Sequence, residues 1–208
     1  MSRRRMMMSF AMQGEPAPEK EYALISTGTQ YIDTGFRPNN NTRVVCRVRA
    51  LSNSGAMFGS RLTNISTQFC IASGSTPQQY RSDFSNSNIL TGVPITNDGI
   101  FHEWDKNKNL TYLDGNLIAN HSGPAFQTEF NLYVFSVNNA GSPMGPYLFS
   151  FGNFQYYDNG VLAGDYIPVV AGSTRFSPTP APRNTFWDKV GQVYMPVSGT
   201  GDFGIEEV

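Results

Sequence analysis

Charge, histidine and cysteine are all scarce in this chain of 208 residues. Asp, Glu, Lys and Arg make up 15% of it, and the formal net charge is −1. Soluble domains typically carry roughly 25% charged residues. This balance gives the body of the protein no electrostatic attraction for nucleic acid or for an anionic membrane surface. The sequence also lacks any run of ~18 apolar residues, the length that a membrane-spanning helix needs. We therefore expect neither nucleic acid nor a membrane among its partners.

The two histidines and two cysteines limit the metal and redox chemistry of the chain. His102 and His121 are too few for a histidine-based metal cluster or for more than a chance Ser-His-Asp arrangement. Cys46 and Cys70 each lie in an apolar, strand-like run, where a free thiol packs as a small hydrophobic group. One disulfide between them is the alternative that the sequence leaves open.

Several aspartates could contribute oxygen ligands to a calcium ion, which requires six to eight of them. They lie near asparagines and glycines, where an Asp side chain more commonly bonds its own backbone in a turn. The sequence therefore assigns no metal and no cofactor to these positions. The aspartates are Asp83, Asp98, Asp105, Asp114 and Asp158.

Glycine and proline, in contrast, are abundant, with 20 and 13 residues that separate many short β-prone runs. Many short strands at regular spacing are typical of an all-β sandwich, and 208 residues suit a single core. We predict a two-sheet antiparallel jelly-roll sandwich that begins at Tyr22. The expected strands are 30–36, 42–51, 55–61, 67–73, 79–84, 99–106, 109–113, 116–120, 130–138, 146–157, 161–170 and 185–188.

Two hairpins are well marked. Asp114-Gly115 and Asn159-Gly160 are preferred pairs for type I′ turns, in which both central residues need positive φ. The segment 173–184 contains three prolines, which withhold ladder donors, so it is predicted to be a loop across an end of the sandwich.

The N-terminal segment 1–21 is expected to be a flexible arm ahead of the domain at 22–208. Its charged part and the apolar part that follows resemble those of a signal peptide. The apolar part is short and interrupted by Ser9, however, and no cleavage site follows it. Residues 13–21 are polar and contain two prolines. The residues that could anchor the arm on a partner are Arg3, Arg4, Arg5, Met6, Met7, Met8 and Phe10.

Several phrases, taken in order, resemble one family. They are the opening STGTQYIDTG at 26–35, FGSR at 58–61, YLDGN at 112–116, NLYVF at 131–135, YDNGVL at 157–162 with DYIPV at 165–169, and GTGDF at 199–203. This order resembles the concanavalin A-like, LamG-type jelly-roll domains of bacterial surface, phage-structural and prophage proteins. The resemblance covers about residues 22–204. It implies the sandwich fold strongly and the function weakly, because this fold hosts lectins, glycoside hydrolases and inert capsid decorations.

An enzyme of this fold class is not expected here. Its glycosidases carry E-x-D-x-x-E on one strand face, but the matching stretch has Glu103, Asp105 and then Lys108, which cannot replace a carboxylic general acid. We read Glu103 and Asp105 as solvent-facing, and no catalytic residue is assigned.

Two functions remain. The favoured one is a virion structural protein, such as a capsid decoration, head fibre or tail-associated subunit, held to other virion proteins by its arm. It is expected at the virion surface, in symmetric copies whose interface the sequence does not name. The alternative is a lectin-like module of a bacterial cell-surface protein. In either setting an exposed aromatic could stack on a sugar, with asparagines at 86–88 and 138–139 bonding hydroxyls. The candidate aromatic residues are Tyr80, Trp104 and Tyr147.

Overall fold

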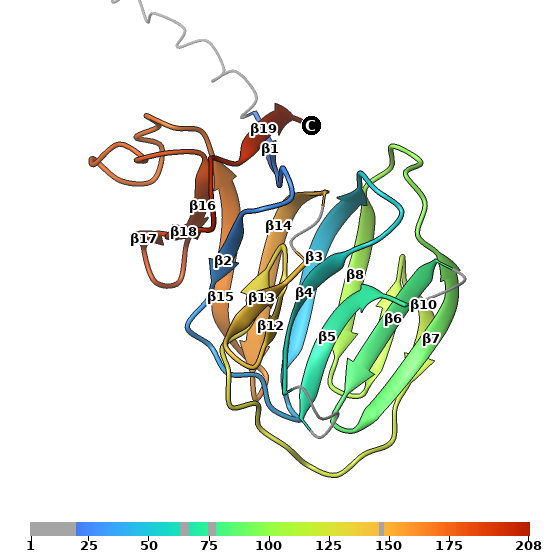
Figure 1. Ribbon diagram of the computed structural model, residues 1–208. Coiled ribbons are helices and arrows are strands. Elements are labelled where there is room, and N and C mark those ends of the chain that lie inside the picture. Colours follow the sequence, from blue (N-terminus) through green and yellow to red (C-terminus); the bar gives the residue numbers. More distant parts are fainter. Residues whose placement is uncertain (1–19, 63–66, 75–77, 146–147) are drawn as a thin grey trace, which may run out of the picture.

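The protein is an antiparallel β-sandwich. A computed structural model describes residues 20–62, 67–74, 78–145 and 148–208, and these form a ten-stranded and a nine-stranded sheet that face each other (Figure 1). The described residues include no helix. Nor does any helix long and apolar enough to cross a membrane occur among them. The predicted all-β, jelly-roll-like fold class is confirmed.

The first sheet, sheet A, has the order β10-β9-β8-β3-β14-β15-β16-β17, with β1 joined to β14 and β19 joined to β1. Its central strands β3, β14 and β15 pair antiparallel along most of their length. The strands are β1 (Tyr22–Ile25), β3 (Arg43–Ala50), β8 (His102–Asn107), β9 (Leu110–Leu113), β10 (Asn116–Asn120), β14 (Phe149–Asp158), β15 (Val161–Val169), β16 (Thr185–Asp188), β17 (Val193–Tyr194) and β19 (Gly204–Glu207).

The second sheet, sheet B, has the order β18-β2-β11-β4-β5-β6-β7, with the hairpin β12-β13 joined to β4. The pairing of β12 with β4 is parallel. The strands are β2 (Tyr31–Asp33), β4 (Ala56–Arg61), β5 (Gln68–Ser73), β6 (Gln79–Phe84), β7 (Ser87–Pro94), β11 (Tyr133–Val134), β12 (Val137–Asn139), β13 (Ser142–Met144) and β18 (Val197–Ser198).

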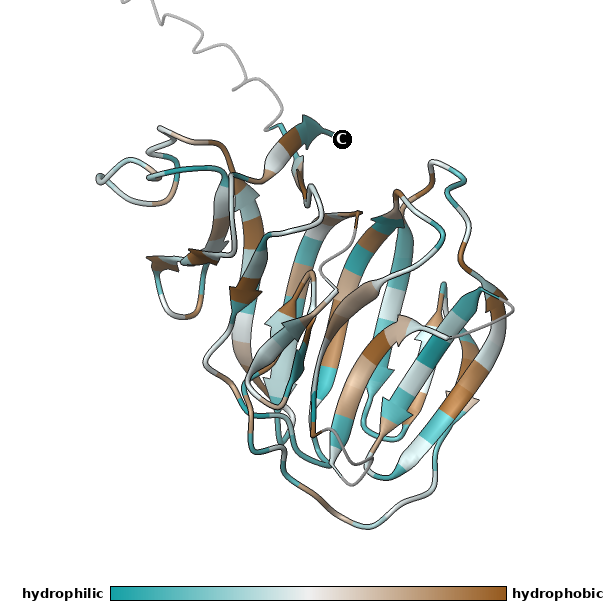
Figure 2. Ribbon diagram, in the orientation of Figure 1, coloured by the Kyte–Doolittle hydropathy of each residue, from teal (hydrophilic) through white to brown (hydrophobic). Residues whose placement is uncertain are grey.

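The core lies between the sheets and is rich in aromatic side chains. β3 shows how the sequence builds it: Val44, Cys46 and Val48 are buried, while Arg43 and Arg47 alternate with them on the outer face. Figure 2 shows the same mixture of hydrophobic and hydrophilic bands along the strands of both sheets. A fully buried Phe or Val side chain stabilises the fold by about 1.5–3 kcal/mol relative to exposure, so this alternation fixes the register.

The predicted strand 130–138 is broken at Phe135. This residue has a φ of 67°, which divides the segment into β11 and β12. Its ring is fully buried and lies 4.6 Å from the ring of Phe151 and 4.5 Å from that of Phe203. Packing of the ring therefore offsets a backbone conformation that is uncommon for a residue with a side chain.

Both predicted type I′ hairpins are confirmed. Asp114 and Gly115 have φ values of 47° and 76°, and Asn159 and Gly160 have values of 50° and 83°. Each pair closes a two-residue turn, between β9 and β10 and between β14 and β15. The proline-containing segment 173–184 has no strand, as expected. It packs on the outer side of sheet A, where Phe176 stacks on Trp187 at 6.0 Å.

Two asparagine-containing segments considered for sugar contacts belong to strands. Ser87 and Asn88 begin β7, which pairs with β6 after a turn at Ser85-Asn86. Asn138 and Asn139 belong to β12. β7 was not predicted, because its polar residues, Gly and Pro lower the apparent β-propensity of a strand that its neighbour nevertheless pairs.

The two cysteines are free and buried, which agrees with the interpretation as packed thiols. Cys46 lies in the core on β3, whereas Cys70 lies on β5, where its thiol is 3.0 Å from a carboxylate oxygen of Asp83. Burial raises the pKa of both thiols. Both are therefore protonated near neutral pH.

Candidate functional site

Two of the three aromatic residues proposed for glycan contact are not at the surface. Tyr80 and Trp104 are 6% and 1% exposed, and their rings pack edge to face at 4.6 Å between the two sheets. This prediction is wrong because both residues occupy inward-facing positions, Tyr80 on β6 and Trp104 on β8. Tyr147 lies outside the described residues, as do all the arm residues named above.

The carboxylates considered for catalysis or calcium are dispersed and partnered. Glu103 is exposed, and the half-buried Asp105 accepts two hydrogen bonds from Arg43 at 2.8 and 2.9 Å. Asp98 and Asp114 both bond the ring of His102, at 3.1 and 2.6 Å. Asp83 pairs with Arg81, and Asp158 accepts from Asn39. Within the described ranges, no three His, Cys, Asp or Glu side chains gather as metal ligands do.

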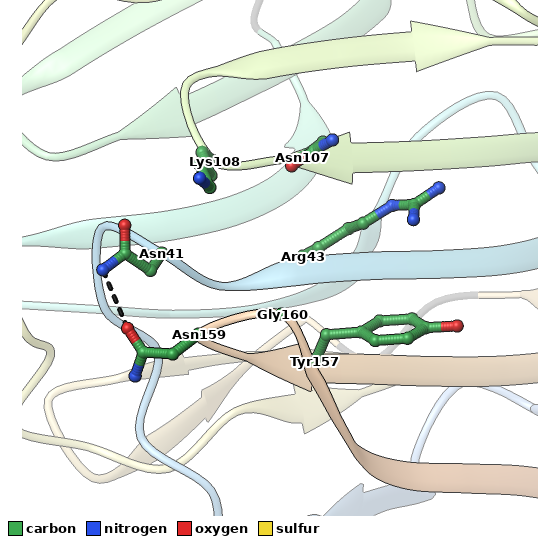
Figure 3. Close-up of a pocket in the computed structure, with 7 residues that line it drawn as sticks. All are labelled: Asn41, Arg43, Asn107, Lys108, Tyr157, Asn159 and Gly160. Atoms are coloured by element: carbon green, nitrogen blue, oxygen red, sulfur yellow. Dashed lines mark hydrogen bonds between the residues drawn. The ribbon is translucent and has the colours of Figure 1, made fainter.

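A polar cleft lies at one end of sheet A, where three segments distant in the sequence meet. We call it the turn cleft, and it has a volume of about 450 Å³ (Figure 3). Its floor is one cross-strand row in which Tyr157, Arg43 and Asn107 are neighbours on β14, β3 and β8. Its rim comes from the turns after β8 and β14 and from the segment before β3. The lining residues are Asn41, Arg43, Asn107, Lys108, Tyr157, Asn159 and Gly160.

Hydrogen bonds between the three segments fix the rim. Asn41 donates from its amide to the side-chain oxygen of Asn159 at 2.8 Å, the contact drawn in Figure 3. Asn39 donates to Asp158 at 2.7 Å, and the backbone N–H of Lys108 donates to the carbonyl of Thr42 at 2.9 Å. These bonds join the ends of β3, β8 and β14, so the cleft is held by strands rather than by long loops.

The floor of the cleft combines a guanidinium, an aromatic ring and an amide. The Arg43 guanidinium lies over the ring of Tyr157 at 5.5 Å, and its Nε and Nη2 atoms donate hydrogen bonds to the carboxylate of Asp105. The hydrogen bonds to Asp105 raise the pKa of Arg43, so it stays charged. The side chains of Asn107 and Lys108 make no hydrogen bond to another described residue. They are available to a ligand rich in hydroxyl groups.

A second cluster, formed by Lys106, Ser82 and His121, has distances typical of a catalytic site, but its serine is buried. The Lys106 ammonium donates to the Ser82 hydroxyl at 2.9 Å, and that hydroxyl is 2.9 Å from Nε2 of His121. A lysine of lowered pKa beside a serine is one form of activated nucleophile. Both Ser82 and Lys106 are fully buried between the sheets, however, so the serine hydroxyl is shielded from solvent.

Comparison of the sequence with models of known protein families, and with curated proteins, finds no match. The fold and the cleft together define a class: an all-β, jelly-roll-like sandwich with a polar, strand-built cleft at one end of sheet A.

The turn cleft was not predicted from the sequence, although its hairpin was. The Asn159-Gly160 turn and the clustered asparagines at 39–41 were visible as turn chemistry. Their meeting depends on β14 lying beside β3, which is a long-range pairing. The available signal was the strict alternation of outward and buried residues along β3, where Arg43, Val45 and Arg47 all face outward. This alternation places Arg43 on the same outer face as the outward residues of the neighbouring strands β8 and β14.

Proposed function

We propose that the protein is a non-enzymatic structural subunit of a phage particle, whose jelly-roll domain is displayed at the virion surface and adheres to glycans through the turn cleft. The N-terminal arm would hold the subunit to other virion proteins. The resemblance to LamG-type domains supports the virion setting, and the composition of the cleft supports the adhesive role.

The turn cleft carries the adhesive part of the proposal. Sugars present hydroxyl groups and a weakly apolar ring face, and a site for them combines an aromatic platform with a few fixed polar groups. Tyr157 supplies the platform, while Asn107 and Lys108 add donors and one amide acceptor to the same cleft. Because the rim is cross-linked by hydrogen bonds, little conformational entropy is lost on binding.

The same cleft gives no support to glycoside hydrolysis. Glycosidases need two carboxyl groups flanking the scissile bond, about 5 Å or about 6.5–9.5 Å apart. No described Asp or Glu lines the cleft, and the two carboxylates bonded to its lining residues, Asp105 and Asp158, are engaged by Arg43 and by asparagine amides. Binding without turnover is the chemistry these residues favour.

A glycan array followed by titration of the hits tests the adhesive role. Replacing Tyr157 by alanine should weaken binding by about tenfold, because the variant loses the stacking surface. Tyr112 gives a matched control, since it is also a half-buried tyrosine on sheet A but lies outside the cleft. Absence of any glycan binding at high protein concentration, or equal losses in the two variants, contradicts the assignment of the cleft.

Deletion of residues 1–19 tests the anchoring role. The described fold starts at Lys20, which pairs with Glu207 at 2.7 Å, so the cut leaves every described contact in place. The truncated chain should keep its circular dichroism spectrum and glycan binding but should no longer enter particles. Normal incorporation of the truncated chain would refute the anchoring role of the arm.

A further inference from the structure

The 173–184 segment forms a groove with the outer side of sheet A, at the end opposite the turn cleft. We call it the strap groove; it consists of two adjoining hollows of about 530 and 360 Å³ that share Tyr22, Pro168 and Arg175. A hollow of this size lies at the lower end of the range of small-ligand sites, about 300–1,000 Å³. None of its residues belongs to the turn cleft.

Cationic side chains from separate elements converge on the smaller hollow. Arg47 comes from β3, Arg175 from the 173–184 segment and Lys189 from the turn after β16. Among the described residues that line it, Glu21 is the only Asp or Glu. This excess of positive charge favours an anionic ligand.

Two of these cations pair with carboxylates at long distances. Arg47 is 3.7 Å from Glu21, and Lys189 is 3.4 Å from Asp165. Arg47 and Glu21 are 41% and 74% exposed, whereas the Asp165 side chain is 13% exposed. An exposed ion pair such as Arg47–Glu21 contributes about 0–1 kcal/mol, so an incoming anion displaces Glu21 at little cost. In the turn cleft, by contrast, Arg43 is engaged by both oxygens of Asp105.

Tyr22 gives the groove an aromatic platform beside the cations. It lines both hollows, and no ring contact or hydrogen bond of its side chain to another described residue is found. Phe176, in contrast, already lies between the Arg175 guanidinium at 4.6 Å and the Trp187 ring at 6.0 Å. A half-buried tyrosine with an unengaged ring next to guanidinium groups suits a ligand that has both a ring face and an acidic group.

We propose that the strap groove binds acidic saccharides, with a sugar ring on Tyr22 and a carboxylate or sulfate between Arg47, Arg175 and Lys189. This inference extends the proposed adhesion to a second site and names its ligand class. The Arg47 guanidinium supplies paired N–H donors that match the two oxygens of a carboxylate or sulfate, and a neutral sugar lacks the negative charge that strengthens such bonds.

Titration of the full chain with an oligogalacturonate tests this site, with its carboxyl-reduced neutral counterpart and polyglutamate as comparison ligands. The oligogalacturonate should bind at least about tenfold more tightly than either comparison ligand, and its affinity should fall as salt is raised. Equal binding of the neutral saccharide overturns the proposal. Polyglutamate binding as tightly as the saccharide assigns the groove to acidic peptides and overturns it as well.

Two charge-matched variants locate the binding. Lys189→Gln should weaken oligogalacturonate binding several-fold, whereas Lys108→Gln, which removes the same charge from the turn cleft, should leave it unchanged. The reverse pattern overturns the assignment. Loss of neutral glycan binding in Tyr157→Ala, with oligogalacturonate binding retained, separates the two sites, so the strap-groove proposal and the proposed function fail on different measurements.

Discussion

Replacing Lys106 by methionine is expected to stabilise the protein at neutral pH. Lys106 is fully buried in the core, where its ammonium contacts the hydroxyls of Ser82 and Thr111 at 2.9 and 3.5 Å. The rings of Phe69 and Phe84 lie 5.0 and 5.8 Å away. Among the described residues, no carboxylate pairs with it within 4 Å. An uncompensated buried charge of this kind is destabilising.

The pKa of Lys106 sets the size of the effect. Burial lowers it from 10.5 to about 8, although the more distant Cys70 and Asp83 partly oppose this. Such a shift corresponds to about 3 kcal/mol of penalty on the protonated amine. Methionine retains a long apolar side chain, and Ser82 keeps its contacts with Thr111 and His121 at 2.7 and 2.9 Å. We expect a gain of about 1–3 kcal/mol in the free energy of unfolding near pH 7.

The gain should disappear at high pH. Between about pH 8 and 10.5 the unfolded chain binds a proton at this lysine and the folded chain does not, so the stability of the wild type rises with pH in that window. The methionine variant lacks this rise. Urea unfolding of both proteins near pH 7 and near pH 10.5, with the exposed Lys189→Met as a control, measures the difference. A methionine variant that is less stable near pH 7, or a difference that does not change with pH, refutes the reasoning.

Three further changes test other parts of the structure. Phe135→Ala should lower the free energy of unfolding by about 3–5 kcal/mol in urea melts, because the core loses a buried ring at a strained position. Gly160→Ala should cost about 1 kcal/mol in the same assay without blocking the cleft, since its φ is 83° and an added methyl group meets no atom within 4 Å. His102→Gln should destabilise more near pH 5.5 than near pH 9. Burial lowers the pKa of His102, but the hydrogen bonds to Asp114 and Asp98 outweigh burial and raise this pKa above 6.5 in the folded protein. The protonated ring therefore stabilises the fold below pH 6.5, and this stabilisation is lost as the pH rises through the pKa of His102 in the folded protein. A pH-independent loss in this variant contradicts that account.

Local turn chemistry and side-chain alternation predicted much of the sandwich. The Asp114-Gly115 and Asn159-Gly160 turns were predictable because only a few residues accept positive φ. The period of two in β3 also carries the outward placement of its arginines, although that placement was not predicted. The break at Phe135 was not predictable, since it depends on rings that approach from β14 and from the segment before β19.

The face of β8 that points into the core was not recognised from the sequence. His102, Trp104 and Lys106 share one face of the strand, as the period of two requires. A lysine on a face usually marks that face as exposed, because buried lysines are rare. Trp104 was predicted as an exposed aromatic, although Glu103 and Asp105 on the opposite face were read as solvent-facing. The turn cleft, which that opposite face forms together with β3 and β14, was missed because it depends on long-range pairing.

The antiparallel pairing of β1 with β19 places both ends of the domain at one corner. β1 meets β14 at Phe151, whereas the turn cleft begins at Tyr157, about 20 Å further along the strand. A tether fused at either end therefore leaves the cleft pointing outward, away from the surface that carries the tether. The same geometry would allow the whole sandwich to be grafted into a surface loop of an unrelated host protein without forcing that loop apart.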